Sequence, residues 1–163
     1  MVEMAATQGE AGSRLPTVQV LTELITFRVT SDQTDGAYTL CETITAPGGG
    51  VPPHVQHKDT EAFYVLEGTY TFTLYDDTIE AGPGESVFVP IGAVHSFMNQ
   101  GSAPARMLIL NSPGGIHEAF FKEVGVPVDD PANAPAPDME AQIARVMQAA
   151  PTYGIEMLPP QAE

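Results

Sequence analysis

Residues 48–68 read GGGVPPHVQHKDTEAFYVLEG, and residues 84–99 read GESVFVPIGAVHSFMN. Both stretches place titratable side chains beside short runs of β-branched and aromatic residues, and glycine and proline mark the turns between them. Neighbouring side chains of an extended chain face opposite sides, so His54 and Gln56 share one face. Glu61 opens the next strand-like run and His95 opens a later one. These four side chains are therefore expected to converge inside a β-structure.

The four side chains form a set of metal ligands. Two imidazoles, an amide and a carboxylate are borderline to hard donors, which suit Mn, Fe, Co, Ni or Zn. Three or four protein ligands leave a coordination position open for water, oxygen or a substrate. The sequence thus predicts a site for one divalent metal ion, with His54, Gln56, Glu61 and His95 as ligands.

Several alternatives stay open at this centre. If Gln56 does not ligate, the two histidines and Glu61 remain, which is the set found in non-haem iron oxygenases. His57 replaces Gln56 only if the strand bulges by one residue, and otherwise lies on the outer face. A metal-free pocket lined by hydrogen-bonded histidines is a further interpretation. His117, on the first turn of a predicted helix, is expected at the surface.

Strand-like runs continue on both sides of these stretches. They cover residues 17–22, 26–30, 37–45, 61–66, 69–75, 86–89, 94–98 and 105–110. Many short strands separated by turn residues predict an all-β sandwich, jelly roll or barrel. The apolar residues expected to fill its interior are Phe63, Phe88, Phe97, Met107 and Ile109. Of these, Phe63, Phe97, Met107 and Ile109 are predicted to form walls of a substrate pocket.

The regions outside this core have a different character. Residues 1–15 are predicted to be a flexible tail, residues 16–112 the β-domain, and residues 113–163 a helical extension packed on it. Helical spacing of apolar residues predicts one helix that ends at Gly125 and a second that Asp138 caps. The apolar side of the second helix is expected to carry Met139, Ile143, Val146, Met147 and Ala150.

The composition excludes several classes of partner. The formal net charge is -15, with only six lysines and arginines, so nucleic acid and anionic membranes are poor partners. No stretch is long and apolar enough to cross a bilayer, and the first residues do not resemble a signal peptide. We therefore expect a cytoplasmic protein that binds a small molecule. The single cysteine, Cys41, excludes an intramolecular disulfide.

The two opening stretches resemble the motifs of the cupin superfamily. The first motif, G-x5-H-x-H-x(3,4)-E-x6-G, is matched by Gly48, His54, Glu61 and Gly68. The second, G-x5-P-x-G-x2-H-x3-N, is matched by Gly84, Pro90, Gly92, His95 and Asn99. Gln56 stands where the first motif has its second histidine, and some cupin isomerases include a glutamine among the metal ligands. Residues 61–68 and 153–156 are similar to the quercetinase-like branch in particular.

The resemblance implies a cupin double-stranded β-helix, that is, a jelly-roll barrel, and a homodimer. It also implies a metal-dependent dioxygenase that acts with molecular oxygen on an enol- or phenol-containing aromatic or polyketide-like molecule. Glu61 would be the catalytic base in such an enzyme. A non-oxidative isomerase, lyase or cyclase and a non-catalytic small-molecule-binding cupin remain as alternatives.

Overall fold

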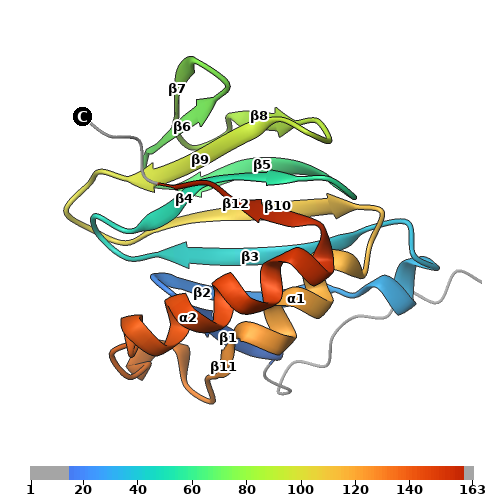
Figure 1. Ribbon diagram of the computed structural model, residues 1–163. Helices are drawn as coiled ribbons and strands as arrows, with labels where there is room; N and C mark the ends of the chain where they lie inside the picture. The colour runs from blue at the N-terminus through green and yellow to red at the C-terminus, as the bar shows by residue number, and fades with distance from the viewer. Residues whose placement is uncertain (1–14, 160–163) are drawn as a thin grey trace, which may run out of the picture.

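The computed structural model describes residues 15–159, which form an antiparallel β-sandwich (Figure 1). One sheet has seven strands in the order β11-β1-β2-β3-β10-β5-β8, and the other has five in the order β12-β4-β9-β6-β7. The strands are β1 (Thr17–Val20), β2 (Glu23–Val29), β3 (Thr39–Thr45), β4 (Gly50–Gln56), β5 (Thr60–Glu67), β6 (Tyr70–Leu74), β7 (Asp77–Ala81), β8 (Ser86–Val89), β9 (Val94–Asn99), β10 (Ala105–Ser112), β11 (Val126–Pro127) and β12 (Ile155–Met157). The predicted all-β jelly roll is confirmed. The predicted tail lies outside the described residues, except for Leu15.

Two α-helices follow the last long strand, as predicted. They are α1 (Ile116–Val124) and α2 (Met139–Ala149), and short 3-10 helices are η1 (Ser31–Thr34), η2 (Pro131–Asn133) and η3 (Ala150–Tyr153). The Asp138 carboxylate accepts a hydrogen bond from Ala141 N at 3.1 Å, so the expected N-cap is present. Neither helix within residues 15–159 is long and apolar enough to cross a membrane.

The buried side of α2 agrees only in part with the expected one. Val146 and Ala150 are buried as expected, whereas Met139, Ile143 and Met147 are exposed. Gln142 is buried instead, and its side-chain oxygen accepts a hydrogen bond from Leu21 N. A polar side chain on the buried face thus provides a partner for a backbone donor of the β1–β2 turn.

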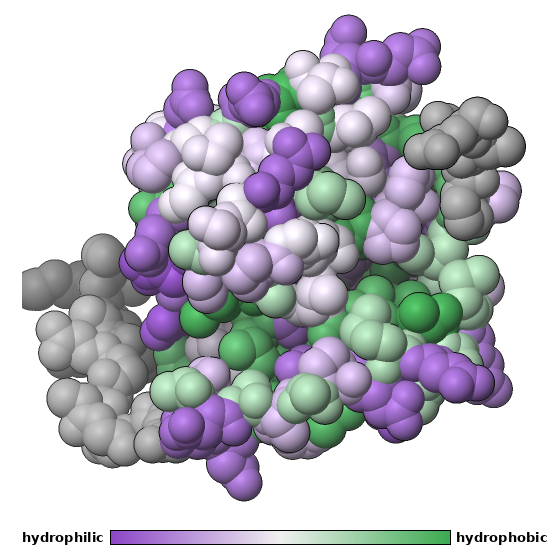
Figure 2. Space-filling model, turned by 90° about the vertical axis from the view of Figure 1, so that its left-hand side faces the viewer, coloured by the Kyte–Doolittle hydropathy of each residue, from purple (hydrophilic) through white to green (hydrophobic). Residues whose placement is uncertain are grey.

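Two apolar clusters make up the core. One lies between β1, β2, β3 and the C-terminal extension, and includes Ile25, Phe27, Phe120, Val124 and Val146. The other fills the space between the two sheets, and includes Phe63, Val65, Tyr70, Phe72 and Met107. In Figure 2, apolar side chains gather in the lower half of the face shown, at the height of β1, β2 and α2 in Figure 1. The extension thus acts as an added wall of the sandwich.

One expected interior residue lies outside both clusters. The Phe88 side chain is 58% exposed, so the prediction that it fills the interior is wrong. It belongs to β8, the edge strand of the seven-stranded sheet, where Val87 and Val89 take the buried face and Phe88 takes the outer one. Strand alternation is correct here, and the aromatic residue falls on the solvent side.

The backbones of β4 and β9 lie so close together at the start of β4 that only a glycine fits there. Gly50 pairs with Met98 on β9, and a Cβ atom at Gly50 would lie 2.1 Å from the carbonyl oxygen of Phe97. Gly92, which precedes the β9 histidine, has a φ of +84°, as expected for a glycine at this turn. The pairing of β4 with β9 therefore depends on the missing side chain of Gly50.

We expect Gly50→Ala to destabilise the protein by about 2 kcal/mol, because the overlap is with backbone and cannot be relieved by a rotamer change. The measurement is the free energy of unfolding in urea. Gly82→Ala is the control, since a Cβ at Gly82 meets nothing closer than 3.7 Å. Equal stability of the two variants would contradict the close β4–β9 approach.

Candidate metal centre

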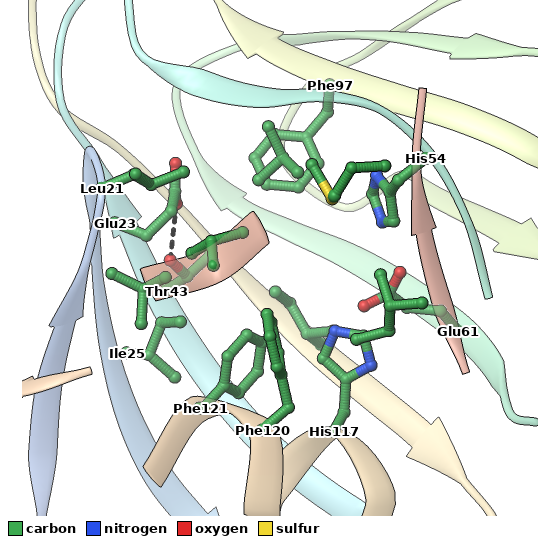
Figure 3. A pocket seen from close by; sticks show the side chains of 16 residues that line it. Leu21, Glu23, Ile25, Thr43, His54, Glu61, Phe97, His117, Phe120 and Phe121 are labelled. Atoms are coloured by element: carbon green, nitrogen blue, oxygen red, sulfur yellow. Dashed lines mark hydrogen bonds between the residues drawn. The ribbon is translucent and has the colours of Figure 1, made fainter. Parts of the chain in front are cut away.

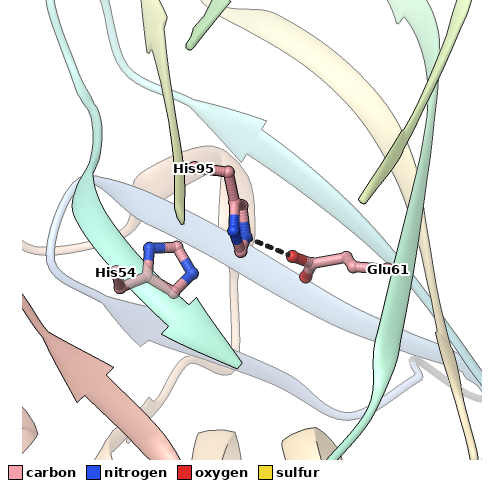
Figure 4. Close-up of side chains that lie close together, drawn as sticks. All are labelled: His54, Glu61 and His95. Carbon is pink, nitrogen blue, oxygen red and sulfur yellow. Dashed lines mark hydrogen bonds and ion pairs between the residues drawn. The ribbon is translucent and has the colours of Figure 1, made fainter. Parts of the chain in front are cut away.

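Three of the predicted ligands converge in the interior of the sandwich (Figure 4). His54 on β4 lies opposite His95 on β9, and their ring centroids are 4.1 Å apart. Glu61 reaches them from β5, which belongs to the other sheet. All three side chains are buried, and one ligand atom from each lies within 4.8 Å of the others.

Backbone carbonyl groups orient both imidazole rings. His54 Nδ1 lies 2.9 Å from the carbonyl oxygen of Pro52, and His95 Nδ1 lies 3.0 Å from that of Ala93. A carbonyl oxygen only accepts hydrogen bonds, so each Nδ1 carries the proton and donates. In the neutral rings Nε2 then has the free lone pair, which is the arrangement that metal-binding histidines use.

The contact between His95 and Glu61 tests whether a cation fits here. His95 Nε2 lies 3.1 Å from Glu61 Oε2, and both side chains are almost fully buried. Because Nδ1 already donates to Ala93, a neutral ring would direct its Nε2 lone pair at a carboxylate oxygen. That contact is favourable only if a proton or a metal ion lies between the two atoms. The donor set therefore fits a divalent cation.

The protonation states favour binding of a cation. Burial lowers the pKa of His54 to about 4, with a contribution from the neighbouring His95, so His54 is neutral at pH 7. Burial alone would raise the pKa of Glu61, but the hydrogen bond from His95 and the nearby imidazoles lower it to about 2. Burial acts to lower the pKa of His95, and the hydrogen bond and charge of Glu61 outweigh it and raise that pKa. A carboxylate and a neutral imidazole are thus available at physiological pH.

Gln56, the fourth predicted ligand, is buried and contacts two residues from outside the motif pattern. Its Nε2 lies 2.8 Å from His117 Nδ1 and 3.4 Å from Asp59 Oδ1. A carboxylate only accepts hydrogen bonds, so the amide nitrogen is the atom that faces Asp59. The Gln56 side-chain oxygen is buried and has no hydrogen-bond partner among the described residues. That oxygen is the atom through which a glutamine would ligate a metal.

The structure corrects the placement of His117. It was expected at the surface, but only 5% of the residue is exposed, and its ring packs edge-on against Phe121. Its Nδ1 also lies 3.4 Å from Asp59 Oδ2. The spacing within this segment contained a signal, because His117 lies one helical turn before Phe120 and Phe121 and shares their buried face. His57, by contrast, has an exposed side chain 2.9 Å from Glu156, away from the cluster.

A cavity of about 60 Å³ adjoins the cluster (Figure 3). It is lined by Val20, Leu21, Glu23, Ile25, Thr43, Val51, His54, Glu61, Phe97, Ile109, His117, Phe120, Phe121, Val146, Ile155 and Met157. Of the four predicted pocket residues, Phe97 and Ile109 line it, whereas Phe63 and Met107 pack in the adjoining apolar cluster. The cavity is small, and its lining is mostly apolar.

Sequence reasoning did not identify Glu23, a buried carboxyl group on the cavity wall. Its Oε2 accepts hydrogen bonds from Thr43 at 2.7 Å and Thr45 at 2.6 Å. Burial raises the pKa of Glu23 to about 7, although the threonine hydrogen bonds act to lower it. The alternation of β2 contained a signal, because Glu23 shares a face with Ile25 and Phe27.

Comparison with known proteins agrees with the geometry. The profile of the cupin domain family (Cupin_2) matches residues 42–111. Quercetin 2,3-dioxygenase of Bacillus subtilis is 30% identical over 118 residues, which make up 72% of this chain and 34% of that enzyme. The mannose-1-phosphate guanylyltransferase 2 of Escherichia coli O157:H7 is 33% identical over 46% of this chain and 16% of its own length. The chain thus spans about a third of the first relative and about a sixth of the second.

Solved structures share the fold. A predicted oxalate decarboxylase from Thermotoga maritima has a TM-score of 0.56 at 18% identity, over 61% of this chain and 92% of that chain. The polyketide cyclase RemF from Streptomyces resistomycificus has a TM-score of 0.50 at 29% identity, over 61% of this chain and 70% of that chain.

The Glu23 carboxyl predicts a pH dependence of stability. Its folded-state pKa lies above the ordinary value of 4.5, so its contribution to stability is fully present below about pH 4.5. It is lost as the pH rises through 7. Glu23→Gln stays neutral, so from pH 4.5 to 8 the variant should lose less unfolding free energy than the wild type, by up to about 3 kcal/mol.

The measurement is urea unfolding at several pH values. Glu80→Gln, which changes an exposed glutamate, is the control and should follow the wild-type profile. Parallel profiles for wild type and Glu23→Gln would contradict the raised pKa.

Proposed function

Because the chain is a small cupin that resembles the quercetinase-like branch, we propose that it is a metal-dependent dioxygenase. Its substrate is an enol- or phenol-containing small molecule of aromatic or polyketide-like type. The observation that carries the proposal is the buried contact of His95 Nε2 with Glu61, which requires a proton or a cation between them. His54, Glu61 and His95 would hold one divalent ion. The Gln56 oxygen, which has no hydrogen-bond partner among the described residues, would be its fourth protein ligand.

A divalent ion bound there supplies a Lewis acid that stabilises negative charge on a substrate oxygen. The protein groups do the rest. Glu61 is ionised at neutral pH, and its Oε1 has only a long hydrogen bond from Asn111, at 3.4 Å. Oε1 is therefore the atom that accepts the proton of an enol or phenol hydroxyl. The carbonyl groups of Pro52 and Ala93 hold the two imidazoles in place while this proton moves.

The walls of the cavity suit a deprotonated substrate that is to react with oxygen. Phe97, Phe120 and Phe121 line it together with aliphatic side chains, so bulk water is excluded from the substrate carbon. The Gln56 amide nitrogen donates a hydrogen bond to His117 Nδ1, and the His117 ring lies at the same wall. The small volume favours a compact substrate, or one that displaces side chains of the C-terminal extension.

A second candidate is a non-oxidative cupin, such as an isomerase, lyase or cyclase, in which the same groups transfer a proton without oxygen. The similarity to the polyketide cyclase RemF favours it, and so does Gln56, since a weak amide donor suits a redox-inert ion.

The assignments of a homodimer and of a cytoplasmic location stay predictions.

Metal content tests the centre. Purified wild-type protein is expected to hold near-stoichiometric Mn, Fe, Co, Ni or Zn, and His54→Ala and His95→Ala are expected to lose it, because each removes a buried ligand. The measurement is elemental analysis alongside circular dichroism. His57→Ala changes an exposed histidine and should keep the metal. Full occupancy in folded His95→Ala would contradict the ligand assignment.

Oxygen uptake separates the two candidate reactions. We expect the metal-loaded protein to consume oxygen with at least one of acetylacetone, 4-methylphenol and quercetin, and Glu61→Gln to reduce the rate by about a hundredfold or more. An oxygen electrode gives the rate, and chelator-treated wild type is the control. Turnover of a probe without oxygen consumption would favour the non-oxidative candidate.

A further inference from the structure

The cavity has a second polar end, remote from the metal ligands. Figure 3 shows Glu23 and Thr43 on one side of the cavity and His54 and Glu61 on the other. The lining between them is apolar and includes Ile25, Phe97 and Phe121, a typical arrangement for a binding site with a few placed polar groups.

The hydrogen bonds of Glu23 leave one of its oxygens with spare accepting capacity. Oε2 accepts from the hydroxyl groups of Thr43 and Thr45, and the Thr45 oxygen also lies 2.9 Å from the Tyr70 hydroxyl. Oε1 has only Thr22, at 3.3 Å, and the same Thr22 hydroxyl lies 3.3 Å from the carbonyl oxygen of Gly50. The Thr22 hydroxyl proton is thus shared between Glu23 Oε1 and the Gly50 carbonyl oxygen, each 3.3 Å away. Oε1 can accept a further, stronger hydrogen bond.

Burial of this carboxyl group is costly. Glu23 is 3% exposed, and no ion pair joins it to any residue in the range 15–159. A buried carboxyl group without a neighbouring cation is destabilising relative to an apolar residue of similar size. Thr43 and Thr45, whose hydroxyl groups donate to Glu23, are fully buried too. Such an arrangement on a cavity wall is typical of a recognition site.

We propose that Glu23, held by Thr43 and Thr45, accepts a hydrogen bond from a hydroxyl group at the end of the ligand that is remote from the metal. The inference rests on the proposed function, since it places the enol or phenol oxygen of the ligand at the metal. The ligand class is then a compact, two-ended molecule. It has an enol or phenol oxygen at one end, a hydroxyl donor at the other and an apolar body between them.

A matched pair of phenols tests this assignment. 4-(Hydroxymethyl)phenol and 4-ethylphenol have the same number of heavy atoms and differ by a hydroxyl against a methyl group. Each is titrated into protein loaded with Co(II), with calorimetry for affinity and the visible Co(II) spectrum for a change at the metal. We expect both to change the spectrum. At pH 8, above the raised pKa of Glu23 (about 7), the hydroxymethyl compound should bind about tenfold more tightly, because a hydrogen bond to a carboxylate is strong.

Two variants assign the preference to Glu23. Glu23→Leu removes the acceptor, and the preference should reverse in favour of 4-ethylphenol. Glu23→Gln keeps a neutral acceptor of the same size, and the preference should fall to about threefold. If Glu23→Leu does not fold, the affinities measured with Glu23→Gln alone test the assignment. Neither substitution is expected to change the Co(II) content, because Glu23 is not among the metal ligands.

Each other outcome has a distinct meaning. Equal affinities of wild type for the two phenols, or a preference unchanged in the variants, would overturn the assignment of Glu23 alone. Protein that holds Co(II) but binds neither phenol would overturn the proposed function, and the inference with it.

Discussion

The contact between His95 and Glu61 is the interaction on which the site depends, because it joins the two sheets inside the sandwich. Its two atoms need a positive charge between them, and the surrounding structure arranges the other groups accordingly. Carbonyl groups of Pro52 and Ala93 orient the histidines, and the β4–β9 pairing places His54 beside His95. The same pairing depends on the bare backbone of Gly50. The packing of the two sheets therefore determines how His54, Glu61 and His95 lie relative to one another. A change in the spacing of the sheets would change the geometry of this candidate metal site.

The sequence predicted the parts of the molecule that short spacing determines. The strand alternation gave the all-β fold, and the two motif stretches identified His54, Glu61 and His95, because each residue keeps a fixed distance from a turn-forming glycine or proline. Contacts between distant segments could not be obtained in this way. His117 was assigned to the surface because it lies outside the motifs, whereas it shares the buried face of α1. Phe88 was assigned to the interior as an apolar strand residue, whereas the alternation of β8 places it on the outer face.

Gln56 and Glu23 are two polar residues whose contacts become apparent only in the folded structure. Gln56 looks like a weakened ligand in the sequence, but its amide nitrogen contacts Asp59 and His117 while its oxygen stays without a partner. An imidazole in its place could not provide both a donor pair on one side and an oxygen on the other. Glu23 looks like an ordinary polar residue at the start of a strand, and only the position of β3 brings two threonines to it. In both cases a polar side chain is retained in the interior where an apolar one would pack more easily.

The position of β12 links the metal centre to the order in which the chain is made. β12 pairs with β4, the strand that carries His54, although about a hundred residues separate them in the chain. Ribosomes add roughly 5–20 residues per second, so β4 waits on the order of 5–20 seconds for this neighbour. During that interval the wall formed by Ile155 and Met157 is absent, so the side of the cavity beside His54 stays open. The cavity is therefore completed only by some of the last described residues of the chain.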